Sequence, residues 1–169
     1  LFALNGAVRT AVLSARPDLF DSPSNLLTEN GKLFFSASSA DGFEVWTSNG
    51  TDAGTHQVKD FELGDGNSRF LGIATVGNKT LLAVANTQYG FELWLSDGSA
   101  GGTTLLKDIN TGTTGAYFSD IVTIGNRAFY SGSGDLSDQE LWSTDVTTGV
   151  STLVKDINQT GSGDPYSLT

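Results

Sequence analysis

The chain has 169 residues and contains no cysteine, no methionine and a single histidine, His56. Without cysteine, the sequence excludes disulfide frameworks, zinc–cysteine sites, iron–sulfur clusters and thiol nucleophiles. A single histidine excludes a His-rich metal site and leaves no spare imidazole base for a serine nucleophile. The remaining candidates for chemistry are the carboxylates, which are abundant.

Basic residues are also scarce, with 9 Lys and Arg against 19 Asp and Glu and a net charge of -10. Such a charge repels phosphate backbones and anionic lipid surfaces, and no basic stripe opposes it. No apolar run reaches the roughly 18 residues that a transmembrane helix needs. We therefore expect no nucleic-acid partner and no membrane insertion.

One spacing recurs through the chain. Four columns of residues repeat with the same step of 48 residues. They are Glu44, Glu92 and Glu140; Trp46, Trp94 and Trp142; Lys59, Lys107 and Lys155; and Asp60, Asp108 and Asp156. Residues 29–76 and 77–124, aligned without a gap, are identical at 17 of 48 positions. A spacing shared by four columns is typical of a repeat protein.

The repeat divides the chain into four parts. These are a degenerate half repeat at 1–28, full repeats at 29–76 and 77–124, and a third repeat with the start of the next at 125–169. Because the chain begins and ends within a repeat, we expect it to be an excerpt or a processed form of a longer array.

Each repeat contains four short segments rich in Val, Ile, Leu, Phe and Thr, separated by Gly, Asn, Asp and Ser. Around the middle copy the expected strands cover residues 70–76, 80–85, 91–96, 103–109 and 118–124. The predicted fold is all-β: a β-propeller-like array of four-stranded antiparallel blades, with about 3.5 copies of the repeat. A β-solenoid is the competing repeat fold, in which each strand stacks on the equivalent strand of the next copy.

The segments around the tryptophans, residues 44–55, 92–103 and 140–145, resemble the ELWxxDGTxxGT repeat. Each is followed by a tail of the Val-Lys-Asp-Ile type, and the third copy departs from the pattern at 146–149. Proteins of that family are bacterial, usually large, exported or surface-associated, and regarded as propeller-like. The resemblance therefore implies an extracellular or cell-surface propeller module, and it carries no catalytic residues.

The repeated columns are first interpreted as structural. Tryptophan in a blade packs against the neighbouring blade, whereas a sugar-stacking platform would need an exposed ring. Glu92 and Lys107 are predicted to form a buried or half-buried ion pair between blades, because a buried charge must be paired. General acid–base chemistry would require one copy to differ from the others, and these columns do not.

Acidic turns make calcium the one cofactor to consider. Calcium takes six to eight oxygen ligands, which Asp, Gly and Asn turns can supply. Asp135 and Asp138 form the best single candidate site. The spacing of an EF-hand or of a calcium-binding nonapeptide repeat is absent, so solvated turn residues are the alternative.

These observations lead to three hypotheses of function. The first is a non-catalytic structural, self-assembling or adhesion module of an exported bacterial protein, whose partner is another copy of itself in a ring or filament. The second is a propeller that binds cell-surface glycans through its rim loops. The third is a propeller glycosidase or lyase domain, which would need two carboxylates at a defined separation.

Overall fold

A computed structural model describes residues 2–5, 8–11, 23–108, 118–133 and 138–168. Within these residues all regular secondary structure is β-strand, and every sheet is antiparallel. No helix long and apolar enough to cross a membrane occurs in the part of the chain that is described. The all-β prediction is confirmed.

The strands form three four-stranded sheets and one two-stranded sheet. The first sheet consists of β3 (Ser24–Glu29), β4 (Lys32–Ser39), β5 (Gly42–Ser48) and β6 (His56–Gln57). The second consists of β7 (Arg69–Val76), β8 (Lys79–Asn86), β9 (Gly90–Ser96) and β10 (Thr104–Lys107). The third consists of β11 (Ser119–Ile124), β12 (Arg127–Gly132), β13 (Glu140–Asp145) and β14 (Val150–Lys155). The N-terminal pair is β1 (Phe2–Asn5) and β2 (Val8–Ala11).

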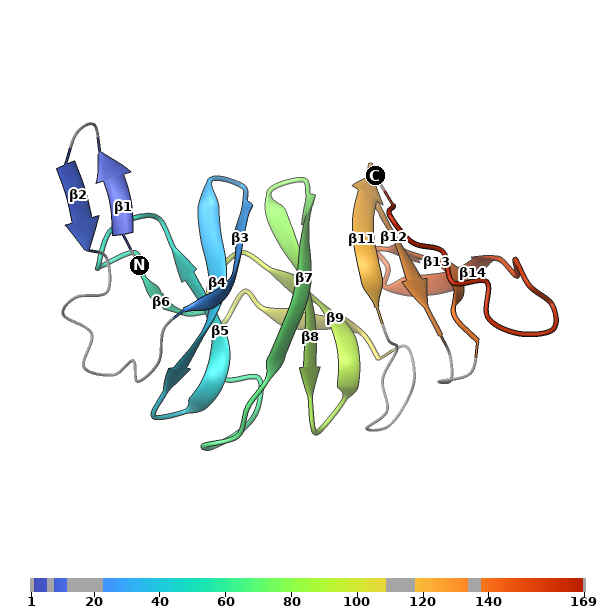
Figure 1. The fold of residues 1–169 in the computed structure, drawn as a ribbon, viewed down its shortest axis with the longest axis horizontal. Helices are drawn as coiled ribbons and strands as arrows, with labels where there is room; N and C mark the ends of the chain where they lie inside the picture. Colours follow the sequence, from blue (N-terminus) through green and yellow to red (C-terminus); the bar gives the residue numbers. More distant parts are fainter. Residues whose placement is uncertain (1, 6–7, 12–22, 109–117, 134–137, 169) are drawn as a thin grey trace.

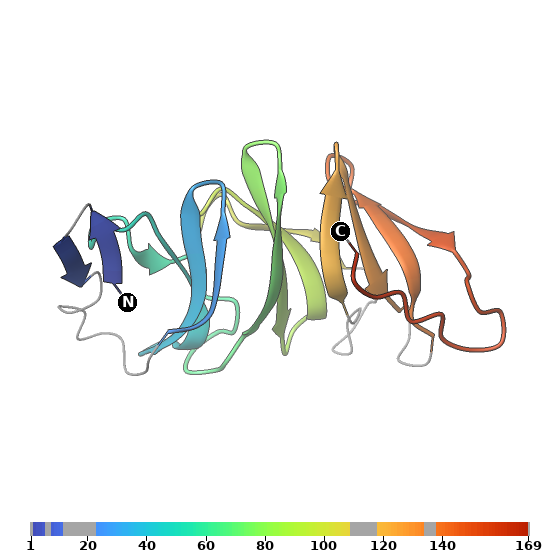
Figure 2. The same ribbon diagram turned by 45° about the horizontal axis from the view of Figure 1, so that its top comes forward.

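The sheets stand beside one another in a row (Figures 1 and 2). Each four-stranded sheet is a meander in which consecutive strands pair, and β7 contacts β3 on one side and β11 on the other. The first strand of each sheet therefore faces its counterparts, as the inner strands of propeller blades do. A solenoid would join equivalent strands of successive copies in one sheet, and the described strands do not pair in that way.

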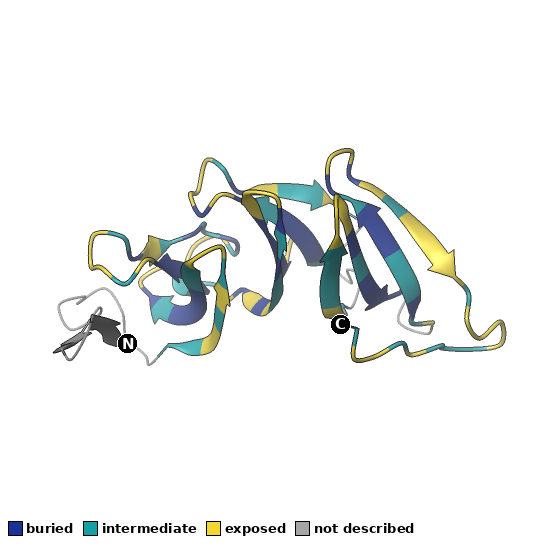
Figure 3. Ribbon diagram, turned by 90° about the horizontal axis from the view of Figure 1, so that it is seen from above, coloured by how far each residue is buried: buried dark blue, intermediate teal, exposed yellow. Residues whose placement is uncertain are grey.

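Apolar side chains fill the two spaces between the three sheets. The cluster between the first two sheets includes Phe34, Val58, Leu82 and Trp94. The cluster between the second and third sheets includes Leu81, Leu93 and Tyr130. Because neighbouring side chains of a strand point to opposite faces, β8 supplies Leu81 to one cluster and Leu82 to the other. Figure 3 shows the middle strands as the most buried part of the molecule.

Tight turns join the first two strands of each sheet, as the sequence predicts at Gly77 and Gly125. Gly77 has a φ of 60° and Gly125 a φ of 59°, which suits the first position of a type II′ turn. In the first sheet Asn30 and Gly31 both have positive φ, of 51° and 69°, as a type I′ turn requires.

The structural unit differs from the sequence repeat in two respects. The predicted boundaries at residues 29, 77 and 125 fall at these turns, so each sheet begins one strand earlier than the repeat drawn on the sequence. In addition, β4 is 47 residues from β8, because the β4–β5 connection has two residues (Ala40–Asp41) and the β8–β9 connection has three (Thr87–Tyr89). The ungapped alignment is therefore displaced by one residue along β3 and β4.

Candidate functional site

The three glutamates of the column are buried, and backbone N–H groups hold the carboxylates of Glu44 and Glu140. Glu44 accepts hydrogen bonds from the N–H groups of Phe61 and Glu62, both at 3.1 Å, and from the Ser68 hydroxyl at 2.8 Å. Glu140 has equivalent partners in the N–H groups of Ile157 at 2.7 Å and Asn158 at 3.3 Å. These two carboxylates thus tie the third strand of their sheet to the segment that follows the fourth.

In the described part of the chain, Glu44 and Glu140 bind backbone N–H groups and not the lysine column, while the Glu92–Lys107 pair stays a prediction. The Lys59 ammonium lies 6.0 Å from the centre of the Trp94 ring, and Lys107 and Lys155 are exposed. The physical reason is that the segment after β6 and the segment after β14 have left their sheets, so their N–H groups need an acceptor. A buried carboxylate meets that need and has its own charge stabilised by the same bonds.

Burial also changes the acidity of Glu44. Removal from water raises its pKa from 4.5 to about 7, and the hydrogen bonds from Ser68, Phe61 and Glu62 oppose this rise only in part. The side chain is 1% exposed and is enclosed by its own sheet and the segment that follows it. A raised pKa of this kind marks a candidate acid–base group, but Glu44 is enclosed by structural partners.

The Asp-Gly-Thr part of the motif is a turn held by its own side chains. The Asp97 carboxylate accepts hydrogen bonds from the N–H and the hydroxyl of Ser99, at 2.9 and 2.7 Å. Asn49 makes the same pair of contacts with Thr51, at 3.1 and 2.7 Å. These bonds from Ser99 hold the pKa of Asp97 below its usual range.

The final Gly-Thr of the motif closes the same turn. A Cβ added at Gly102 would overlap the Asp97 carboxylate, and one added at Gly54 would overlap the Asn49 side chain. The following threonine is joined to the end of the third strand by a buried hydroxyl pair, which is Ser96–Thr103 at 2.6 Å in the second sheet. The Ser48–Thr55 and Thr144–Ser151 pairs, each at 2.7 Å, repeat it in the other sheets.

The third copy keeps the hydroxyl pair and changes the turn. Asp145 accepts hydrogen bonds from the N–H groups of Thr147 and Thr148, and the Gly149 N–H donates to the Asp145 carbonyl. Residues 146–149 are the segment in which the sequence departs from the repeat motif. The departure therefore produces a different turn at the same place in the sheet.

Two of the three tryptophans of the column are buried. Trp46 is 3% and Trp94 5% exposed, in agreement with the predicted packing role and not with an open stacking platform. The Trp94 ring meets Phe61 edge-on at 5.1 Å and Tyr89 at 5.9 Å. Trp142, in the third sheet, is only half-buried.

The remaining predicted site residues lie apart from one another. Asp60, Asp108 and Asp156 each have one buried carboxylate oxygen with no hydrogen-bond partner. Of the tentative calcium pair, Asp138 is exposed and Asp135 lies outside the described residues. The described residues contain no cluster of three or more His, Cys, Asp or Glu side chains that could hold a metal ion.

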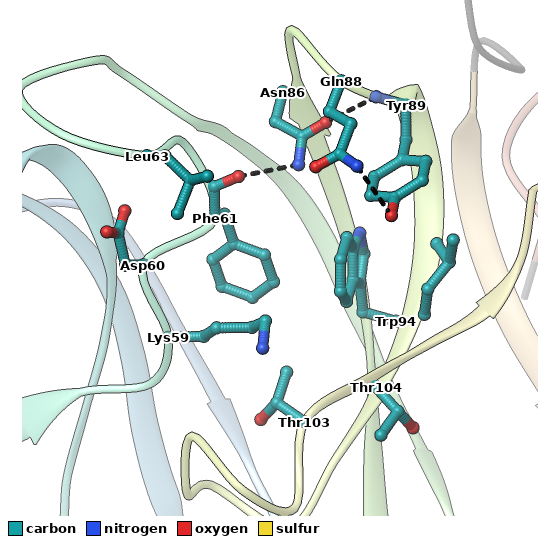
Figure 4. Close-up of a pocket in the computed structure, with 11 residues that line it drawn as sticks. Lys59, Asp60, Phe61, Leu63, Asn86, Gln88, Tyr89, Trp94, Thr103 and Thr104 are labelled. Carbon is teal, nitrogen blue, oxygen red and sulfur yellow. Dashed lines mark hydrogen bonds between the residues drawn. The ribbon is translucent and has the colours of Figure 1, made fainter. Parts of the chain in front are cut away.

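A cavity lies between the first and second sheets (Figure 4). It has a volume of about 390 Å³, and Trp94 and Tyr89 face Lys59 and Phe61 across it. Asn86 connects the two sides, since its amide donates to the Phe61 carbonyl at 2.7 Å and its oxygen accepts from the Tyr89 N–H at 2.8 Å. Gln88 donates to the Tyr89 hydroxyl at 2.9 Å.

Sequence reasoning missed Asn86, Gln88 and Tyr89 because it followed the residues that recur. Tyr89 precedes Gly90 as Asp41 precedes Gly42, so Asp41 is its counterpart in the first copy. They could have been recognised by their difference from the repeat, because an aromatic and two amides occur in a single copy, beside a recurrent tryptophan.

The fold has counterparts among solved structures. No family model matches the chain, and no curated protein matches its sequence. A puromycin hydrolase is similar with a TM-score of 0.55 and 10% sequence identity, over 78% of this chain and 20% of that chain. A chain of a nidogen/laminin complex is similar with a TM-score of 0.50 and 15% identity, over 86% of this chain and 50% of that chain. The chain is therefore shown to have an all-β, propeller-like fold, and it spans half or less of these two chains.

Proposed function

We propose that this chain is a non-catalytic, propeller-like repeat module of an exported, cell-surface bacterial protein, serving as a self-assembling or adhesion scaffold. The proposal is supported chiefly by the hydrogen bonds that the recurrent polar side chains make. Glu44 and Glu140 bind backbone N–H groups, and Asn49 and Asp97 in the turns bind Thr51 and Ser99. Side chains occupied in this way hold the backbone of each sheet together, which supports a structural role for these recurrent groups.

The proposed membership of the ELWxxDGTxxGT group rests on the same contacts. The geometry gives several residues of that motif a structural role, among them the buried glutamate and the glycine beside the turn carboxylate. Export to the cell surface follows from the resemblance, because members of that group are exported or surface-associated.

Self-association is supported by the outer face of the third sheet. Residues of the second sheet that pack against the third include Val76 and Leu106. Their counterparts 48 residues later are Ile124, which is 71% exposed, and Val154, which is 46% exposed. The third sheet thus carries the same apolar face as the second sheet, but no following sheet covers it among the described residues. Exposed apolar faces of this kind mark interaction surfaces.

We infer that the occupant of this face is a second copy of the chain. Another copy carries sheets of matching shape and spacing, so a head-to-tail contact would continue the packing already present between sheets. Such a contact closes into a ring or propagates as a filament.

Light scattering at micromolar concentration tests this proposal. The wild-type chain is expected to have the mass of two or more copies, and Val154→Glu is expected to reduce it to that of one. Leu63→Glu is the matched control, because Leu63 is 80% exposed but lies in the β6–β7 connection between the first two sheets. A monomeric wild-type chain would contradict self-association, and turnover of a polysaccharide would contradict the non-catalytic role.

A further inference from the structure

We propose that the cavity between the first two sheets binds a carboxylate-bearing sugar, a uronate, through Lys59, Trp94 and Tyr89. This inference does not depend on self-association, because the cavity lies within one chain. Its volume of about 390 Å³ falls in the range of ordinary small-molecule sites, roughly 300–1,000 Å³.

The first argument is the supply of hydrogen-bond donors. Trp94 is 5% exposed, and its buried indole Nε1 has no hydrogen-bond partner. A buried donor without an acceptor is unfavourable, so an acceptor brought by a ligand would stabilise it. The Lys59 ammonium lies 6.0 Å from the centre of the same ring. A ligand between these groups would therefore be favoured if it carried acceptor oxygens and a negative charge.

The second argument is the difference between copies. Trp142 Nε1 also lacks a partner, so the indole donor is a property of the column. In the second copy a tyrosine from the connection before the third strand, Tyr89, lies against that tryptophan with a ring separation of 5.9 Å. The counterpart of Tyr89 in the first copy is Asp41, an exposed acid. Tyr89 therefore departs from the repeat at a position beside the cavity, which indicates a role other than packing.

The third argument is the character of the walls. Phe61, Leu63 and Leu105 give the cavity apolar surface, and Asn86 and Thr104 give it polar groups. Sugars match such a lining, because they present C–H faces to apolar walls and hydroxyl groups to polar ones. Asp60 also lines the cavity, but its carboxylate points away from Trp94 (Figure 4). The charge next to the indole is therefore the lysine ammonium, which favours an acidic sugar over a neutral one.

Titration of the chain with glucuronate and with glucose, followed by tryptophan fluorescence and calorimetry, tests the inference. We expect glucuronate to bind at millimolar concentrations, and to bind at least about tenfold more tightly than glucose. Lys59→Met should remove this preference, whereas Lys107→Met, which changes the exposed lysine of the same column, should retain it.

A second pair of variants separates binding from folding. Tyr89→Ser should weaken glucuronate binding at least about tenfold with the circular dichroism spectrum unchanged, because the tyrosine is on a connection between strands. Asp41→Ser, at the counterpart position, should bind as the wild type does. The inference is overturned if neither sugar binds, if glucose binds as tightly as glucuronate, or if Lys59→Met and Tyr89→Ser leave the affinity unchanged. None of these results depends on the oligomeric state.

Discussion

At the scale of single residues, the glutamate column shows how a carboxylate can be part of a fold and remain sensitive to pH. Glu44 receives three hydrogen bonds, which favour its ionised form, and it lies where water cannot reach it. Burial is the stronger effect, because the pKa of Glu44 is raised from 4.5 to about 7. The folded state therefore binds a proton more tightly than the unfolded chain does.

This difference in proton affinity makes the stability of the folded chain depend on pH. Glu44 contributes protonation-linked stability that is fully present below pH 4.5 and is lost as the pH rises through about 7. The difference between these limits is about 3 kcal/mol, at roughly 1.4 kcal/mol for each unit of pKa. We expect the free energy of unfolding of Glu44→Gln to fall less between pH 4.5 and 8 than that of the wild type.

Urea denaturation at a series of pH values measures this difference. Asp65→Asn provides the control, because Asp65 is an exposed acid in the β6–β7 connection, which also holds the hydrogen-bond partners of Glu44. If the wild type and Glu44→Gln had parallel pH profiles, the carboxyl would titrate alike in the folded and unfolded chains, contrary to the expectation.

At the scale of the element, the turn between the third and fourth strands is held by contacts that leave no room for a methyl group. We expect Gly102→Ala to destabilise the chain by about 1–3 kcal/mol, because the new Cβ would overlap the Asp97 carboxylate and break the turn. Gly101→Ala is the matched control, since a Cβ at Gly101 meets no atom within 4 Å. Thermal denaturation of both variants gives the comparison, and equal midpoints would refute the steric role of Gly102.

The elements also show which parts of the structure the sequence could predict. The strands, the turns at Gly77 and Gly125 and the burial of Trp94 follow from local composition and from the period, because each depends on neighbours in the chain. The partners of Glu44 could not be predicted from the sequence, since two of them are backbone N–H groups 17 and 18 residues away. Residue types do not show which backbone groups a side chain will bind. The cavity did not follow either, because its distinguishing residues do not recur.

At the scale of the whole molecule, stability is expected to be graded along the row of sheets. Most of β8 is buried, and its two faces contribute to the two core clusters between sheets. Most of β14 is exposed, and one face of the third sheet has no sheet against it among the described residues. In repeat proteins each unit is stabilised mainly by its nearest neighbours.

We therefore expect amide hydrogen exchange to be slowest in β8 and fastest, among the strands of the three large sheets, in β14. Exchange measured by mass spectrometry on a dilute, monomeric sample tests the gradient. At high concentration, protection of β14 should increase if a second copy covers the third sheet. Uniform exchange across the three sheets in the dilute sample would show that they unfold as one unit.

The unequal strand connections noted in the fold have a consequence for engineering. Ala40–Asp41 and Thr87–Tyr89 join the second and third strands of the first two sheets with different numbers of residues, while the buried glutamate stays in place after each. A peptide grafted into one of these connections should therefore leave the scaffold intact. An array of such sheets could carry a different graft in every copy, and so display several recognition loops at a regular spacing.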